Sequence, residues 1–379
     1  MSNLAIKIED YDIESKAVSY FKEIFIKFSI KKKTIELDII FQIVYEDLGI
    51  SKLNSETKDI LTNWFENITQ LKYLKDIVAE RVEEVVIHNP NHVLAFYSNE
   101  VKSKCLSISA KDIELSMQVL TTKKGLAWNY NNPFISFHSH INNYSVRMTL
   151  IHSSIEGEKG CPKVFIRIIG NQPLELNLFT GNENVDSILK NLIINKENVL
   201  ITGSTGSGKT TFLNSLLNKI KDEHVVVLED TKEISIKDPN FTYMLSNSHP
   251  EYTLKKYCEY VLRMRPDRII LGEMRGEEVI PFILSMNNGH RGLMSTIHAN
   301  CASDGLNRVA LLFELKVQNK SIDYSTILKM VARNINYVVH LDKKKVTEII
   351  KVFGSDGERV TFEYIYSLNK NACKEYNAT

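Results

Sequence analysis

The sequence predicts an α/β protein whose carboxyl-terminal half is built on a mostly parallel sheet, preceded by a small α+β domain and a helical leader. Three observations indicate this class. Helical patterns fill residues 1–80. Short β-branched and aromatic runs, broken by polar turns, follow over residues 81–170. Beyond a stretch that contains Pro and Gly, strand-like runs alternate with helical segments, the pattern of a mostly parallel sheet.

Length and composition fit such a multidomain chain. Its 379 residues allow two to three domains, and 43% hydrophobic with 25% charged residues is ordinary for a globular protein. A net charge of +1 gives no global attraction to nucleic acid or anionic lipid. The amino terminus is acidic and no apolar run is long enough to span a membrane, so we expect a cytoplasmic protein. The five cysteines form no CxxC pair, which argues against a zinc ribbon or a disulfide framework.

The leader places apolar residues at three- and four-residue spacings, for example over residues 35–50 and 57–78. The domain at residues 81–170 contains Arg147 and Arg167, each inside a strand-like run. An outward-facing charge is the simpler interpretation of each arginine. The alternative is that both reach a phosphate across a domain boundary.

Residues 171–183 contain Gly and lack a strong period, which predicts a linker, and residues 184–379 then form the last domain. Inside it, the apolar run Val199–Thr202 leads into a glycine-rich loop and an apolar-periodic segment, the strand–loop–helix context of a P-loop. We expect this loop to bind the phosphates of ATP through Gly203, Ser204, Thr205, Gly206, Ser207, Gly208, Lys209, Thr210 and Thr211. Lys209 suits the β- and γ-phosphates, and the Thr210 hydroxyl suits Mg²⁺.

Two acidic residues follow apolar strand-like runs, the place where ligands bind in open α/β sheets. Glu229 ends the first run, and Glu273 follows the second run with Arg263 and Arg265 close by in the sequence. Glu273 suits the Mg²⁺ shell and Glu229 suits the orientation of a water, although these two roles are interchangeable at this level. His298 ends a further run, where a structural role competes with one at the γ-phosphate. No His/Cys set has zinc spacing.

Four motifs in this order, GSTGSGKTT, VVLEDTKEI, LRMRPDRIILGEMRG and NGHRGLMSTIHAN, resemble those of the type II/IV secretion ATPases, the VirB11-like and CpaF-like family of hexameric motors. The resemblance implies a RecA-like domain, a homohexameric ring, and ATP with Mg²⁺ bound between two domains. It also implies Glu229 in the Asp box, Glu273 in Walker B and His298 in the His box. SVRMTLIH and VFIRI are similar to family strands whose arginines approach the nucleotide, which favours that role for Arg147 and Arg167.

Together these observations predict an ATPase with catalytic residues Glu229, Glu273 and His298, and with Arg263 and Arg265 as clamps on phosphate charge, in their own protomer or from a neighbouring one. The partners that the resemblance implies are further copies of the chain and inner-membrane secretion or pilus platform proteins, reached by peripheral membrane association and without direct nucleic-acid binding. Two other classes remain open, a RecA-like nucleic-acid translocase or helicase and a scaffold that binds ATP without hydrolysing it.

Overall fold

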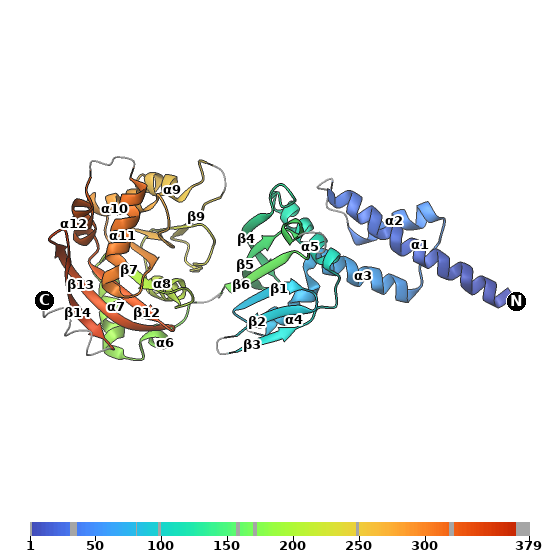
Figure 1. Ribbon diagram of the computed structural model, residues 1–379, viewed down its shortest axis with the longest axis horizontal. Helices are drawn as coiled ribbons and strands as arrows, with labels where there is room; N and C mark the ends of the chain where they lie inside the picture. Colours follow the sequence, from blue (N-terminus) through green and yellow to red (C-terminus); the bar gives the residue numbers. More distant parts are fainter. Residues whose placement is uncertain are drawn as a thin grey trace. The chain divides into compact units, whose positions relative to one another are not determined.

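The chain forms two structural units, Met1–Ile169 and Gly170–Thr379, each with its own sheet, in a computed structural model (Figure 1). The structure describes residues 2–30, 36–80, 82–97, 100–156, 160–169, 173–247, 250–317 and 322–368. Among these, no helix combines the length and the hydrophobicity that crossing a membrane requires. The predicted fold class, α/β with a helical leader and a smaller α+β domain, is confirmed.

The first unit contains a helical leader and an antiparallel sheet in the order β3-β2-β1-β6-β5-β4. Its helices are α1 (Ser2–Ile30), α2 (Leu37–Leu48), α3 (Ser55–Gln70), α4 (Lys72–Ala79), α5 (Ala110–Lys123) and the 3-10 turn η1 (Ser153–Glu156). Its strands are β1 (Glu84–Asn89), β2 (His92–Phe96), β3 (Val101–Lys104), β4 (Phe134–Ile141), β5 (Tyr144–Ile151) and β6 (Lys163–Ile169).

Helix α5 lies between two hydrophobic cores of this unit. On one side, Ile113 and Met117 pack with α4 and the inner face of the sheet. On the other side, Val119 joins the cluster made by α1, α2 and α3. The Trp64 indole of α3 also donates a hydrogen bond of 2.9 Å to Asp112 at the start of α5. The helical leader therefore ends with α3, because α4 packs in the core of the sheet.

The second unit is a mixed sheet in the order β14-β13-β12-β7-β11-β10-β8-β9, in which β12 through β9 run parallel. Its strands are β7 (Val199–Gly203), β8 (Val225–Glu229), β9 (Phe241–Leu245), β10 (Arg268–Leu271), β11 (Met294–His298), β12 (Tyr337–Asp342), β13 (Lys345–Ser355) and β14 (Val360–Ser367). Its helices are α6 (Asn177–Thr180), α7 (Glu183–Ile194), α8 (Lys209–Leu217), α9 (Leu254–Val261), α10 (Val279–Asn287), α11 (Ala302–Lys316) and α12 (Tyr324–Asn334).

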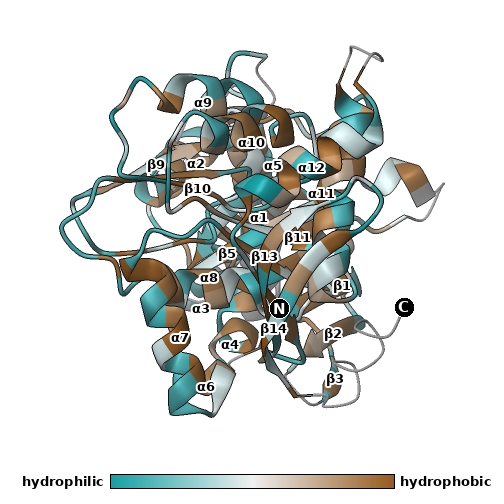
Figure 2. Ribbon diagram, turned by 90° about the vertical axis from the view of Figure 1, so that its left-hand side faces the viewer, coloured by the Kyte–Doolittle hydropathy of each residue, from teal (hydrophilic) through white to brown (hydrophobic). Residues whose placement is uncertain are grey.

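Successive strand residues of this unit enter opposite cores, as the pleat of a strand requires. Leu200 packs with α9 to α12 on one face, whereas Val199 and Ile201 pack with α6, α7 and α8 on the other. The helices show the matching pattern, and the ribbon of α7 changes between hydrophobic and hydrophilic residues in Figure 2. Burial of this sheet on both faces explains the uninterrupted apolar residues Val199–Ile201, Val225–Leu228 and Ile269–Leu271 in the sequence.

The predicted linker at residues 171–183 is partly folded. Residues 171 and 172 lie outside the described part of the chain, but Leu176 and Phe179 are buried in the core beside α8. Phe179 meets the Phe212 ring at 5.4 Å between centroids. This segment therefore belongs structurally to the second unit.

Arg268, the first residue of β10, is an ion-pair anchor at the amino-terminal edge of the parallel strands. Its side chain is fully buried, its Nε donates to Glu223 at 2.7 Å, and its NH2 group donates to the Ile193 carbonyl at 2.6 Å. One arginine thus joins the end of α7, the start of β8 and β10.

We expect Arg268→Ala to lower the free energy of unfolding by about 3 kcal/mol, because the core loses a fully buried side chain together with its hydrogen bonds to Glu223 and to the Ile193 carbonyl. Chemical denaturation followed by circular dichroism measures this change. Arg308→Ala, at an exposed position of α11, is the control and should shift the free energy by no more than about 0.5 kcal/mol. Equal stabilities of both variants would contradict the anchor role.

Candidate active site

Four loops of the second unit meet at one edge of its sheet. The loops follow β7, β8, β10 and β11, which are parallel neighbours, so that their carboxyl ends lie together. Glu229, Glu273 and His298 each lie at or just beyond one of these ends, next to the glycine loop. The edge at the carboxyl ends of parallel strands is where open α/β sheets bind ligands.

The glycine loop connects β7 to α8 and needs glycine for two different reasons. A Cβ on Gly203 would lie 2.4 Å from the Leu341 carbonyl oxygen, so no side chain fits there. Gly208 caps α8 with φ +91°, a left-handed conformation that side chains disfavour. The loop therefore brings backbone N–H groups and the positive end of α8 to one point, which is the arrangement that binds phosphate.

Lys209 is buried at 7% exposure and faces the carbonyls of its own loop. Its ammonium donates to the carbonyl oxygens of Gly203 and Ser204, each at 2.9 Å, and lies 3.1 Å from Nδ1 of His298. An ammonium has no acceptor capacity, so the Nδ1 of His298 is the acceptor in this contact. Burial, and then the charge of Lys209, lower the pKa of His298, which favours the neutral imidazole.

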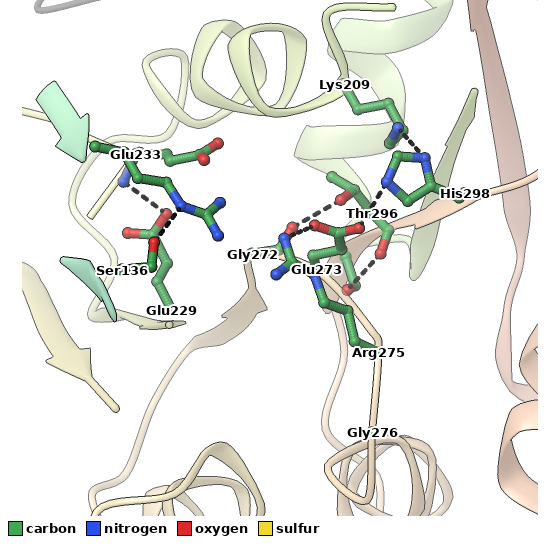
Figure 3. Close-up of polar contacts among 12 residues, drawn as sticks. Ser136, Lys209, Glu229, Glu233, Gly272, Glu273, Arg275, Gly276, Thr296 and His298 are labelled. Atoms are coloured by element: carbon green, nitrogen blue, oxygen red, sulfur yellow. Dashed lines mark hydrogen bonds and ion pairs between the residues drawn. The ribbon is translucent and has the colours of Figure 1, made fainter. Parts of the chain in front are cut away.

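His298 continues this contact to the acidic residue beyond β10 (Figure 3). Its Nε2 lies 3.0 Å from Oε1 of Glu273, and the other Glu273 oxygen pairs with Arg275. A polar chain Lys209–His298–Glu273–Arg275 therefore crosses from the glycine loop to the loop after β10. The Thr296 hydroxyl donates to the Gly272 carbonyl at 2.8 Å, which joins the strand that ends in His298 to the residue before Glu273.

Glu229 is the buried carboxylate of the site, at 4% exposure. Its Oε1 accepts the backbone N–H groups of Glu233 and Ile234 at 3.1 and 3.0 Å. Its Oε2 is buried with no hydrogen-bond partner among the described residues. Burial raises the pKa of this carboxyl to about 8, against the two backbone hydrogen bonds that lower it. Glycine at position 272 admits this side chain, because a Cβ there would lie 3.0 Å from Glu229 Cγ.

The structure does not bring Arg263 and Arg265 to this edge. Both are exposed and lie between α9 and β10, where Arg265 has φ +53° and its carbonyl oxygen is 3.4 Å from Nδ1 of His224. They precede β10, whereas Glu273 follows it, and a strand of this length separates its ends by about 13 Å. The expectation that these two arginines clamp phosphate charge is therefore not met at the glycine loop of their own chain, and their action from a neighbouring protomer stays a prediction. Arg275, beyond β10, is the arginine of this motif that reaches the acidic residue.

Arg147 and Arg167 lie in the first unit, directly opposite each other on β5 and β6. Their neighbours Val146, Met148 and Ile166 are buried in the core, so both arginines project from the other face of the sheet. Arg147 Nε donates to Ser136 Oγ at 3.3 Å. Like charges directly opposite each other destabilise a sheet.

The donor set of the site suits Mg²⁺. Among the described residues there is no cluster of three or more His, Cys, Asp or Glu side chains that a dedicated protein cage would need. Mg²⁺ requires less, since one or two carboxylates together with substrate phosphates and waters are enough. Thr210, in the first turn of α8, and Glu273 are the residues that would hold it, and the bound ion would neutralise phosphate charge.

Sequence reasoning missed one neighbour of the glycine loop. The backbone N–H of Lys344, in the turn between β12 and β13, donates to the Ser207 carbonyl at 3.1 Å. Three consecutive lysines after an apolar strand are typical of a solvated turn, so the sequence alone carries no signal for this contact.

Comparison with known proteins identifies the family. The sequence model of the type II/IV secretion system protein family matches residues 132–376. The chain belongs to this family. A type IV secretion system protein VirB11 of Bartonella quintana is 34% identical over 187 residues, covering 46% of this chain and 52% of that protein. Protein VirB11 of Agrobacterium fabrum is 31% identical over 180 residues, covering 45% and 52%. The chain thus matches about half the length of these relatives.

Solved structures of the family share the fold. The pilus retraction motor PilT with bound ADP aligns with a TM-score of 0.55 and 16% identity, over 82% of this chain and 87% of that one. The ATPase DotB of Legionella pneumophila aligns with a TM-score of 0.54 and 16% identity, over 78% and 80%. A likeness at this identity supports the RecA-like architecture of the second unit with a further domain before it.

The raised pKa of Glu229 predicts a stability that depends on pH. The carboxyl titrates near its ordinary value of 4.5 in the unfolded chain and near 8 in the folded one. Between these values the folded protein holds a proton that the unfolded chain has lost, so the free energy of unfolding falls as pH rises. From pH 6 to pH 8 we expect the parent to lose about 2 kcal/mol relative to Glu229→Gln, which has no such proton.

Urea denaturation of both proteins across this pH range measures the difference. Glu358→Gln, at an exposed position, serves as the control and should follow the parent. A Glu229→Gln variant whose stability parallels the parent at every pH would contradict the burial argument.

Proposed function

We propose that this chain is a Mg²⁺-dependent ATPase that hydrolyses ATP to ADP and phosphate at the edge formed by the glycine loop, Glu229, Glu273 and His298. The observation that carries the proposal is the polar chain from Lys209 through His298 to Glu273, at the carboxyl ends of adjacent parallel strands. Membership of the type II/IV secretion family supports the same activity.

Phosphate binding changes the contacts of Lys209. In the structure its ammonium is held by two loop carbonyls and by His298. Phosphate oxygens carry more negative charge than these acceptors and form stronger hydrogen bonds with an ammonium. Lys209 therefore turns toward the β- and γ-phosphates and leaves Nδ1 of His298. The contacts of His298 therefore change when the loop binds phosphate, and this change reaches Glu273 and Arg275, to which His298 is connected.

Glu229 acts as the base in the chemical step. Its unpartnered Oε2 accepts a proton from a water molecule as the water oxygen attacks the γ-phosphorus. The bond from the γ-phosphorus to the bridging oxygen breaks, and ADP leaves with the electron pair. Glu229 is competent only when it is deprotonated, so kcat/KM rises with pH toward its pKa of about 8.

Arg147 and Arg167 supply positive charge to the phosphates from the first unit. Two arginines directly opposite each other on one sheet face present two positive charges to an anion at that face. A triphosphate is such an anion, and an arginine that neutralises developing charge is worth about 10³–10⁵ in rate. Arg263 and Arg265, at the far edge of the sheet, have no role at their own site in this proposal.

The assembly is a homohexamer, located in the cytoplasm and peripheral to the inner face of the cytoplasmic membrane. Its partners are inner-membrane platform proteins of a type IV or type II secretion system, or of a Tad or type IV pilus. Loss of the γ-phosphate releases the arginines and lets the two units rotate, which is how hydrolysis becomes mechanical work. The rival class of nucleic-acid translocases has no support from the family membership.

Lys209→Ala should lower the rate of ATP hydrolysis at least about a hundredfold, because the ammonium is the main cation of the glycine loop. Glu229→Gln should bind ATP with ordinary affinity and yet turn over at a similarly reduced rate. A phosphate-release assay with matched nucleotide titrations measures both. Parental turnover in Glu229→Gln would contradict a catalytic role for Glu229. Parental turnover in Lys209→Ala would contradict ATP hydrolysis at this glycine loop.

Arg147→Thr should reduce hydrolysis at least about tenfold while the free energy of unfolding stays within about 0.5 kcal/mol of the parent. Threonine suits a strand, and the substitution removes one of two opposed charges, so no large loss of stability follows. Lys102→Thr, an exposed position on β3, is the matched control for both assays. If Arg147→Thr hydrolyses ATP like Lys102→Thr, the arginine pair has no part in the reaction.

A further inference from the structure

The turn between β12 and β13 has an unfavourable backbone. Lys343 and Lys344 form this two-residue connection, with φ values of +46° and +63°. Hairpins of this kind favour Asn-Gly or Asp-Gly, because both central residues need a positive φ. Each lysine in the left-handed region costs about 1 kcal/mol or more, and such cost is characteristic of functional sites.

The turn also lies against the glycine loop. Strand β12 pairs with β7 up to Leu341 and Gly203, which places the hairpin end beside the start of the loop. The Lys344 N–H donates to the Ser207 carbonyl at 3.1 Å. A Cβ on Gly208 would lie 3.6 Å from Cγ of Lys344, so the stem of this lysine passes the residue that caps α8.

The charge of the turn is concentrated in three lysines. Lys343, Lys344 and Lys345 are all exposed and consecutive. The ammonium of Lys345 donates to the Leu178 carbonyl at 2.7 Å, which fastens the turn to α6. Lys344 differs from its neighbours because its stem runs along the capping glycine, next to the N–H groups that receive phosphate.

We infer that Lys344 is a second nucleotide-binding lysine, which contacts the α- or β-phosphate of a nucleoside di- or triphosphate beside the amino-terminal end of α8. This inference rests on the proposed function, because it places a further cation at the same loop. The loop N–H groups hold the α- and β-phosphates and Lys209 serves the β- and γ-phosphates. Lys344 therefore contributes equally to ADP and ATP. The strained turn persists because it holds this charge in place.

Substitutions in the turn distinguish binding of phosphate by the Lys344 side chain from a purely structural role of the turn. Asparagine tolerates a positive φ and keeps the N–H that bonds to Ser207, so Lys344→Asn removes the charged side chain, keeps this backbone contact and relieves the strain. We expect its Kd for ADP and for ATP to rise about fivefold to tenfold, while its melting temperature is unchanged or higher. Lys344→Arg keeps the charge and should stay within about twofold of the parent.

Lys343→Asn is the matched control, since it relieves the same strain and removes the same charge one residue away. It should bind nucleotide within about twofold of the parent. Titration with fluorescent N-methylanthraniloyl-ADP, and competition by ATP, measure all four proteins at two salt concentrations.

Two results would overturn the inference. One is parental affinity in Lys344→Asn, which would make the turn a structural support only. The other is an equal loss in Lys343→Asn and Lys344→Asn, which would reduce the effect to general surface charge. Lys209→Ala is measured alongside. If the parent protein binds no nucleotide, the proposed function itself is contradicted. If the parent binds nucleotide and only Lys209→Ala weakens that binding, the proposed function stands and the inference about Lys344 is contradicted.

Discussion

The parallel alignment of β7, β11, β10 and β8 is the constraint on which the site depends. Because these strands share a direction, the residues that follow them converge at one edge although they are far apart in the sequence. Pairing Gly203 with His298 in adjacent strands brings the glycine loop and the histidine together without any further device. The contacts of His298 with Lys209 and Glu273 follow from this register.

The two edges of the same sheet differ in the polar groups that they bury. At the carboxyl edge, Glu229 is buried with one carboxylate oxygen lacking a hydrogen-bond partner among the described residues, and the turn at Lys344 adds backbone strain. At the amino-terminal edge, Arg268 is buried with its carboxylate and carbonyl acceptors in place. Arg268 nevertheless leaves one guanidinium nitrogen, Nη1, without a hydrogen-bond partner among the described residues, so both edges bury an unsatisfied group, and that of Glu229 lies at the candidate ligand site.

Much of this arrangement was predictable from local sequence. The glycine loop, the acidic strand ends and His298 were predictable because an apolar run followed by a polar residue already fixes the edge at which that residue lies. Arg263 and Arg265 were misplaced because closeness to Glu273 in sequence was given more weight than their position before the strand. The contact between Lys344 and Ser207 was not predictable, since it depends on pairing between β12 and β7 across a long stretch of chain.

The position of α5 between two cores has a mechanical consequence. Ile113 and Met117 belong to the core of the sheet and Val119 to that of the leader, so the two cannot separate without exposing one side of this helix. A pull on α1, α2 or α3 would thus be borne by α5 and delivered to the strands that carry Arg147 and Arg167. The amino-terminal helices are therefore joined to the sheet through the packing of α5.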